Sequence, residues 1–269
     1  MKKVAVFSLL LGASLLLFTG GAGWAQSRRP GTSPAKKSPL ATIRAYQRDR
    51  DERLALGNTR PLRVLEMSFR VAPGFSFNSA EGTGAYSQFQ PNGLGVRLSL
   101  GPSLDYFFYK DRYAFSTGLW YTVNRSSFLV PGSFGQDRFR PGLPPVESVY
   151  NLQYLQIPLT VKLYANELGP SLRGYIQCGG LLSIKLAEKA LDQPTNPLYR
   201  QATAAGTYER QYGFMDVGVL LGAGVQYKIN DVNALNLGLS YQRGLVNVVR
   251  ENALVSRSGT VALELGFKF

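Results

Sequence analysis

Side chains that commonly carry catalysis are scarce in this sequence. The 269 residues contain no histidine and a single cysteine, Cys178. Catalytic triads with histidine, cysteine–histidine pairs and Cys/His zinc sites are therefore excluded. No G-x-x-x-x-G-K-[ST] phosphate-binding loop occurs. A carboxylate-based or lysine-based enzyme is compatible with the composition, but no residues form a catalytic pattern. We therefore expect a protein that is not an enzyme and has no cofactor, metal or catalytic residue.

Charged residues instead recur at alternate positions in segments whose other positions are apolar. This spacing places them on one face of a strand, where opposite charges on neighbouring strands can pair. The residues concerned are Glu66, Arg70, Arg97, Asp105, Lys162, Arg173, Asp216 and Glu264. We predict that they form a structural charge network inside a closed sheet.

Two-residue periodicity after Pro61 predicts the strands that must hold these residues. The clearest example is 93–108, where Val96 and Leu98 alternate with Arg97 and Ser99. The predicted strands are 62–73, 93–108, 112–127, 149–165, 172–188, 213–228, 233–246 and 260–269. Several reach the length of about 9 to 11 residues that crosses a bilayer at a tilt.

The connections between these strands alternate in length. The short turns are 109–112, 166–170 and 229–232, and the longer loops lie near 74–93, 129–148, 190–211 and 247–257. An even strand number with short turns on one rim and long loops on the other is typical of outer-membrane barrels. We predict an all-β fold, an eight-stranded antiparallel transmembrane up-and-down β-barrel. Its apolar row faces lipid, its polar row faces inward, and both termini lie in the periplasm.

Residues 1–25 have the features of a secretory signal peptide. Two lysines precede an apolar run over 4–18, and the small residues Gly23 and Ala25 precede the expected cleavage before Gln26. The run is shorter than the roughly 20 residues that a transmembrane helix needs. The mature protein is therefore expected outside the cytoplasm.

Residues 26–60 are polar and basic and are rich in proline and serine in their first half. This composition predicts a mostly disordered periplasmic linker, with a short helix as an alternative for 42–56. The barrel domain is expected over 61–269. The net charge of +13 indicates an anionic partner, and export favours outer-membrane lipid and lipopolysaccharide over nucleic acid.

The end of the chain carries one apolar row. Leu265, Phe267 and Phe269 alternate with small or charged residues. This row resembles the targeting signal that the outer-membrane assembly machinery recognises in its clients. Aromatic residues near predicted strand ends suit an interfacial girdle. These are Tyr106, Phe108, Tyr109, Tyr113, Tyr164, Tyr227 and Phe267.

Two further expectations concern single residues. Proline cannot donate a ladder hydrogen bond, so Pro158 predicts a bulge or local bend at 157–158. Cys178 falls on the apolar row and is expected to face lipid as a small apolar residue.

Three segments resemble the PorT-like outer-membrane β-barrel proteins of Bacteroidota. They are YLQIPLTVKLY at 154–164, GFMDVGVLLGAGVQY at 213–227 and LSYQRGLVNV at 239–248. The resemblance covers about 61–269 and implies a location in the outer membrane. Some members of that family are tied to protein secretion, and no catalytic residues come with the resemblance.

We therefore expect a noncatalytic outer-membrane barrel with a structural or interaction role, linked to secretion or envelope assembly through an unknown envelope protein partner. Exposed loop aromatics are candidates for contact, namely Tyr86, Phe89, Phe128, Phe134 and Phe139. Arg125, Arg138 and Arg140 are candidates for contacting lipopolysaccharide phosphates. The alternatives are a small transport pore, a lipid-modifying barrel enzyme, and a soluble periplasmic ligand-binding barrel whose apolar row faces inward.

Overall fold

The computed structural model describes residues 44–45, 48–49, 52, 61, 63–134, 143–169, 171–204, 211–230, 232–250 and 253–269. The predicted signal peptide, 1–25, and nearly all of the predicted linker, 26–60, lie outside these residues. The five described residues between 44 and 52 are helical, within the stretch for which a short helix was the alternative. None of the helices in these described segments is long and apolar enough to cross a membrane.

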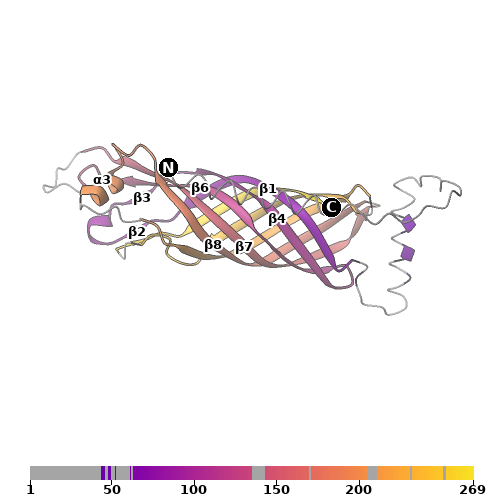
Figure 1. The fold of residues 1–269 in the computed structure, drawn as a ribbon. Helices are drawn as coiled ribbons and strands as arrows, with labels where there is room; N and C mark the ends of the chain where they lie inside the picture. Colours follow the sequence, from indigo (N-terminus) through magenta and orange to yellow (C-terminus); the bar gives the residue numbers. More distant parts are fainter. Residues whose placement is uncertain are drawn as a thin grey trace. The chain divides into compact units, whose positions relative to one another are not determined.

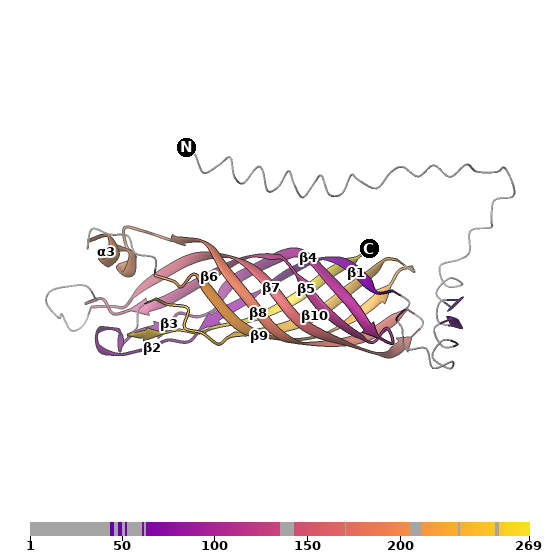
Figure 2. The ribbon, with the colours of Figure 1, turned by 60° about the horizontal axis from the view of Figure 1, so that its bottom comes forward.

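Antiparallel strands form a closed ring (Figures 1 and 2). Their bounds are β1 Leu65–Asn78, β4 Gly95–Tyr109, β5 Tyr113–Gly118, β6 Trp120–Val130, β7 Val146–Gly169, β8 Leu172–Ala190, β9 Met215–Lys228, β10 Ala234–Gly244 and β12 Ser258–Lys268. The last strand pairs with the first, with Phe267 opposite Phe69. Because β5 and β6 together occupy one position in the ring, the described residues form a ring of eight strand positions. The predicted up-and-down barrel is confirmed.

The two faces of the barrel wall differ in polarity as the alternation predicts. In β4, Val96 is 65% exposed on the outside, whereas its neighbour Arg97 is 3% exposed on the inside. Cys178 is exposed on the outer face. Tyr164 is a correction to the predicted girdle, because it is buried and points inward. Tyr164 lies two residues after Lys162 in β7, so both side chains point to the inward face, opposite to the apolar row.

One end of the barrel carries additional short elements (Figure 1). They are β2 Glu81–Gly82, the 3-10 helix η1 Gly84–Tyr86, β3 Gln90–Pro91, α3 Pro197–Ala204 and β11 Leu254–Val255. They belong to the predicted long loops, so we call this end the loop end. The chain ends at the opposite end of the barrel (Figure 1), which also carries the short turns.

The barrel wall has unequal height at the loop end. Pairing between β8 and β9 stops at Ile184 opposite Met215, while pairing between β7 and β8 continues to Tyr150 opposite Ala190. Strands β6 to β8 therefore form a tall wall, and β9, β10 and β12 form a low one. This difference in height positions the features described below.

The tall wall inverts its polarity toward the loop end. Lower down, its outward residues are apolar, as in Leu155 and Leu159. Higher up, Arg125 and Lys189 point outward, and Phe128 and Tyr150 are buried on the inside. An outer surface that changes from apolar to polar has left the hydrocarbon region of the membrane.

Of the bulge or local bend predicted at Ile157–Pro158, the bulge does not occur, and the bend stays a prediction. Pro158 pairs in regular register with Leu181 of β8, and the register shifts in this strand lie elsewhere. On the other side, the ladder runs from Trp120 opposite Gln156 to Thr117 opposite Leu159 and leaves Pro158 without a partner in its ladder. The missing N–H is thus accommodated by an interruption of the neighbouring strand, between β5 and β6, with no extra residue.

Candidate functional site

The lumen holds a buried ion pair near its middle. The Arg70 Nη2 atom lies 2.5 Å from Glu264 Oε1. The guanidinium also stacks over the Trp120 ring, at 3.7 Å from the ring centroid. Gln177 donates from Nε2 to both carboxylate oxygens of Glu264, at 3.4 and 3.3 Å. Residues from β1, β6, β8 and β12 therefore meet at one level and close the lumen there.

A second buried pair lies toward the short-turn end. Lys162 Nζ donates to both oxygens of Asp105, at 2.9 and 3.0 Å, and the Tyr164 hydroxyl donates to Asp105 Oδ2 at 3.1 Å. Arg173 stacks over Tyr164 at 4.0 Å from the ring centroid. A third pair joins Lys268 Nζ to Glu66 Oε2 at 2.5 Å.

All eight residues of the predicted charge network lie on the inward row. Seven are buried and Asp216 is half-buried. Arg70 pairs with Glu264 and Lys162 pairs with Asp105, whereas Glu66 takes a partner from outside the predicted set. Among the described residues, Arg97, Arg173 and Asp216 form no ion pair within 4 Å. The structural role of the set stays a prediction.

The sequence reasoning missed Lys268, Lys185 and Glu188. Lys185 Nζ lies 2.6 Å from Glu188 Oε2, with both side chains buried. Lys268 and Lys185 occupy inward positions that the same alternation rule identifies. Glu188 does not, because the register shifts where Ala187 and Lys185 face consecutive residues of β7. This bulge changes the phase of the alternation within β8.

Above the ion pairs, a belt of neutral polar side chains surrounds Arg97. Its Nη2 donates to Gln156 Oε1 at 2.6 Å, and Thr122 donates to the same oxygen at 2.8 Å. Gln156 donates in turn to Ser183 Oγ at 3.0 Å. These contacts connect β4, β6, β7 and β8 across the lumen.

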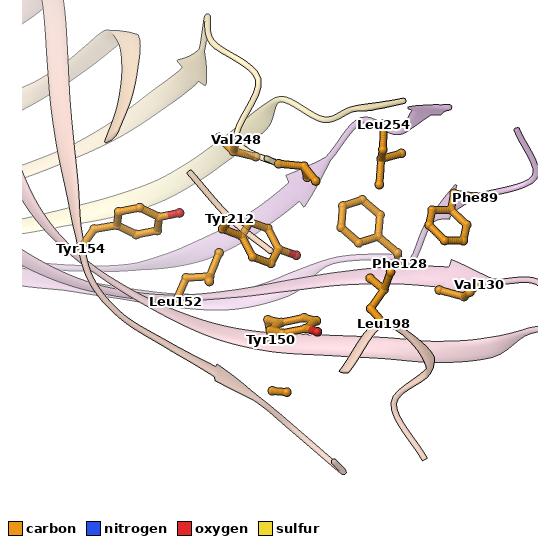
Figure 3. Close-up of a cluster of buried hydrophobic side chains, with 12 residues drawn as sticks. Phe89, Phe128, Val130, Tyr150, Leu152, Tyr154, Leu198, Tyr212, Val248 and Leu254 are labelled. Carbon is orange, nitrogen blue, oxygen red and sulfur yellow. The ribbon is translucent and has the colours of Figure 1, made fainter. Parts of the chain in front are cut away.

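A buried apolar cluster, which we call the cap, fills the lumen at the loop end (Figure 3). The cap consists of Phe89, Phe128, Val130, Tyr150, Leu152, Tyr154, Ala190, Leu198, Tyr212, Val248, Val249 and Leu254. Its members come from the tall wall, from α3 and from the loop-end segments outside the ring strands. These segments contribute Phe89, Tyr212, Val248, Val249 and Leu254. Tyr212 and Tyr150 pack edge to face, with ring centroids 5.4 Å apart.

The cap corrects the expectation for the loop aromatics. Phe89 and Phe128 are buried within it, and Tyr86 and Phe134 pack against it half-buried. Phe139 lies outside the described residues. Aromatic side chains in the loops were expected to be exposed, but an open barrel end offers an interior that they fill.

The remaining predicted sites lie on the surface. Arg125 is exposed on the outer face of β6, and Arg138 and Arg140 lie outside the described residues. Leu265, Phe267 and Phe269 are exposed along the outward row at the end of the chain. In the segments that the structure describes, no three His, Cys, Asp or Glu side chains come together as a metal site.

The free space inside the described part of the lumen is divided into small cavities. One of them, lined by Arg97, Asp216 and Gln242 among others, has room of about 30 Å³ for water-sized molecules. Two others, around Lys268 and around Glu264, have about 20 Å³ each. Such volumes hold one or two water molecules. The ion pairs, the belt and the cap separate them.

A closed ring with an exposed apolar row and a buried polar row defines a transmembrane β-barrel of the outer-membrane type. The chain belongs to the outer membrane protein beta-barrel domain family, whose model matches residues 24–250. Family and fold place it in the outer membrane. A comparison with curated proteins found no match.

Solved structures to which this chain is similar include Neisserial surface protein A, with 14% identity, a TM-score of 0.41 and coverage of 76% of this chain and 97% of that one. OprG from Pseudomonas aeruginosa has 13% identity, a TM-score of 0.43 and coverage of 75% and 95%. The outer membrane enzyme PagL has 10% identity, a TM-score of 0.29 and coverage of 74% and 98%.

Proposed function

We propose that this chain is a noncatalytic, non-conducting outer-membrane barrel of the PorT-like type, with a structural or interaction role in secretion or envelope assembly. The observation that supports this proposal is the filled lumen. Ion pairs at two levels, the polar belt and the apolar cap each occupy the cross-section of a barrel that is narrow enough for side chains to fill. The protein then acts through its loop end and its periplasmic side, with both termini in the periplasm.

Conductance tests the closed lumen directly. Purified protein refolded into planar bilayers should give no stable current steps across the voltage range that the bilayer tolerates. A porin inserted under the same conditions provides the positive control. Stable channels from the wild-type chain would favour the alternative function, a small transport pore.

Site-specific photocrosslinking in intact cells tests the interaction role. Photoreactive side chains at the exposed loop-end positions Glu81, Lys189 and Arg200 should crosslink to the same envelope protein. The matched control is Leu98, which is exposed in the apolar band and should crosslink to lipid alone. Crosslinks to no protein from any loop-end position would contradict an interaction role at this end.

The exposed Arg125 supports a second contact of the same barrel, with lipopolysaccharide. Arg125 points outward where the tall wall has become polar, at the level where phosphate groups of the outer leaflet are expected. Replacing Arg125, Arg138 and Arg140 by alanine should weaken binding to isolated lipopolysaccharide. Equal binding by the triple variant would remove this proposal.

The exposed row of Leu265, Phe267 and Phe269 supports recognition by the outer-membrane assembly machinery. Deleting Phe269 should reduce the fraction of chain that shifts on an unheated gel, which measures assembled barrel. An equal assembled fraction would argue against the signal.

A further inference from the structure

The outer face of the tall wall carries two cations and an amide in one row across three strands. Arg125 of β6 lies opposite Asn151 of β7, and Asn151 lies opposite Lys189 of β8. All three side chains are on the outward face, where Arg125 and Lys189 are exposed and Asn151 is half-buried. Residues directly opposite each other on one face of a sheet are neighbours. We call these three residues the tall-wall row.

The spacing of the tall-wall row suits a single anion. Adjacent strands lie about 4.8 Å apart, so the backbones of Arg125 and Lys189 are separated by roughly 10 Å. Both side chains are long and flexible, and each can extend over Asn151, which lies midway between them. A guanidinium, an ammonium group and an amide N–H can then converge on one group. Donors of this kind form charge-assisted hydrogen bonds with phosphate oxygens.

The two cations of the tall-wall row have no counter-charge in the described part of the barrel. Neither Arg125 nor Lys189 forms an ion pair with a described carboxylate. Glu188, next to Lys189 in the sequence, belongs to a buried ion pair. Glu147 is outward on the same strand as Asn151, but it lies four residues nearer the loop end. The row therefore presents positive charge that an external anion can neutralise.

The tall-wall row lies just beyond the apolar band of the barrel. The next two outward rows toward the short-turn end are Val123, Gln153 and Ala187, followed by Tyr121, Leu155 and Ile184. From Val123 to Arg125 the strand climbs two residues, or about 5 Å along the barrel axis at a usual rise and tilt. The headgroup layer extends about 5 to 8 Å beyond the hydrocarbon core. With the loop end outside the cell, as proposed above, the row is level with the phosphates of the outer leaflet.

We propose that the tall-wall row binds one phosphate group of the lipopolysaccharide headgroup. This inference rests on the proposed contact with lipopolysaccharide and defines its site. It adds Asn151 and Lys189 to Arg125, and it places the phosphate on the barrel wall, where Arg138 and Arg140 are not required.

The test measures binding of isolated lipopolysaccharide to the full mature chain refolded in detergent micelles. Arg125→Gln and Lys189→Gln should each weaken binding by about fivefold, because each removes a cation at the lipid surface. Asn151→Ala should weaken it by about two- to fivefold through the lost amide donor. Arg200→Gln, which removes an exposed cation of α3, is the matched control and should change binding by less than about twofold. The shift on an unheated gel shows whether each variant is assembled.

Two further probes identify the ligand group. Lipopolysaccharide stripped of its lipid A phosphates should bind equally to the wild-type chain and to the Arg125→Gln, Lys189→Gln double variant. Inorganic phosphate should compete only weakly, because it has no acyl chains to pack against the apolar band. Inorganic phosphate that displaces lipopolysaccharide at equal concentration would assign the row to a soluble ion and would overturn the proposal.

Failure of this inference and failure of the proposed contact give different results. If Asn151→Ala and Lys189→Gln bind like wild type while the triple arginine replacement weakens binding, the contact stands and the site on the tall wall is wrong. If all these variants bind like wild type, both proposals are removed. A loss with Arg200→Gln as large as with Lys189→Gln would indicate unspecific attraction and would also overturn the site.

A measurement on the wild-type chain covers the case in which the variants fail to assemble. Lipopolysaccharide should slow the acetylation of Lys189 relative to that of Lys110, which lies in a short turn at the opposite end. Equal protection of the two lysines would contradict the site.

Discussion

At the scale of single residues, Glu264 is a charge of the lumen with several buried partners. It pairs with Arg70 and accepts two hydrogen bonds from Gln177, while Arg70 stacks on Trp120. These hydrogen bonds and the ion pair offset the loss of hydration of the buried carboxylate. Its partner Arg70 depends on it for charge balance, because no other carboxylate of the described residues lies within 4 Å of that guanidinium.

Glu264→Ala should destabilise the barrel by about 3 to 5 kcal/mol, because it leaves Arg70 buried without a counter-charge. Urea unfolding in lipid vesicles, followed by the fluorescence of Trp120, measures the loss. The double replacement Arg70→Met with Glu264→Leu should recover much of it, since no charge is then left unpaired. The exposed Arg125→Ala control should change stability by about 1 kcal/mol or less. A single variant as stable as wild type would show that water or another group screens Arg70.

Tyr212 makes the cap sensitive to alkaline pH. Burial raises the pKa of this hydroxyl well above its usual value, and the bond with Ser126 at 2.9 Å opposes the shift. Because the folded pKa exceeds the unfolded value of about 10, the contribution to stability is complete below pH 10 and is lost as pH rises beyond it. Trypsin cleavage at the loop end should therefore accelerate above about pH 10. Tyr212→Phe should remove that part of the dependence, whereas Tyr227→Phe on the outer face should keep it.

At the scale of elements, two-residue alternation was sufficient to predict a strand at each of the eight positions of the ring and the inward direction of the eight charged residues named from the sequence. The alternation gave wrong predictions in two places, at a bulge and at the level where the outer surface changes from apolar to polar. The bulge in β8 altered the phase and hid Glu188. Toward the loop end, apolar side chains face inward and polar ones face outward. Phe128 was therefore expected on the surface, although it is buried. Neither the level of the membrane nor a bulge is encoded in local periodicity, because both depend on how distant strands pair.

Pro158 provides a matched comparison within β7. Thr160 is paired on both sides, with Ser116 and with Gly179, whereas Pro158 has a ladder partner only in β8. Thr160→Pro should therefore cost about 3 kcal/mol or more, by deleting a ladder bond and straining the strand. Pro158→Ala should cost about 1 to 2 kcal/mol, from lost packing and rigidity alone. The midpoints of urea unfolding compare the two, and equal losses would mean that the interrupted neighbour does not accommodate the proline.

At the scale of the whole barrel, the strands are longer than a membrane requires. The apolar outward row of β4 spans the twelve steps from Val96 to Phe108, or roughly 30 Å at a usual rise and tilt. The 24 residues of β7 extend roughly 60 Å by the same estimate. The excess lies at the loop end, where the outside is polar and the inside is apolar. The barrel therefore combines a membrane segment with a projecting segment that is built like a water-soluble protein.

Cysteine labelling tests which way this asymmetric barrel points. In a Cys178→Ala background, Lys189→Cys places a thiol on the tall wall at the loop end, and Arg112→Cys places one in a short turn at the opposite end. A membrane-impermeant maleimide on intact cells should label the Lys189→Cys variant and spare the Arg112→Cys variant until the outer membrane is permeabilised. Leu98→Cys, within the apolar band, should stay unlabelled in both conditions because maleimide reacts with thiolates in water. Labelling of the Arg112→Cys variant before permeabilisation would place the short turns outside the cell, and would reverse the proposed assignment of the termini to the periplasm.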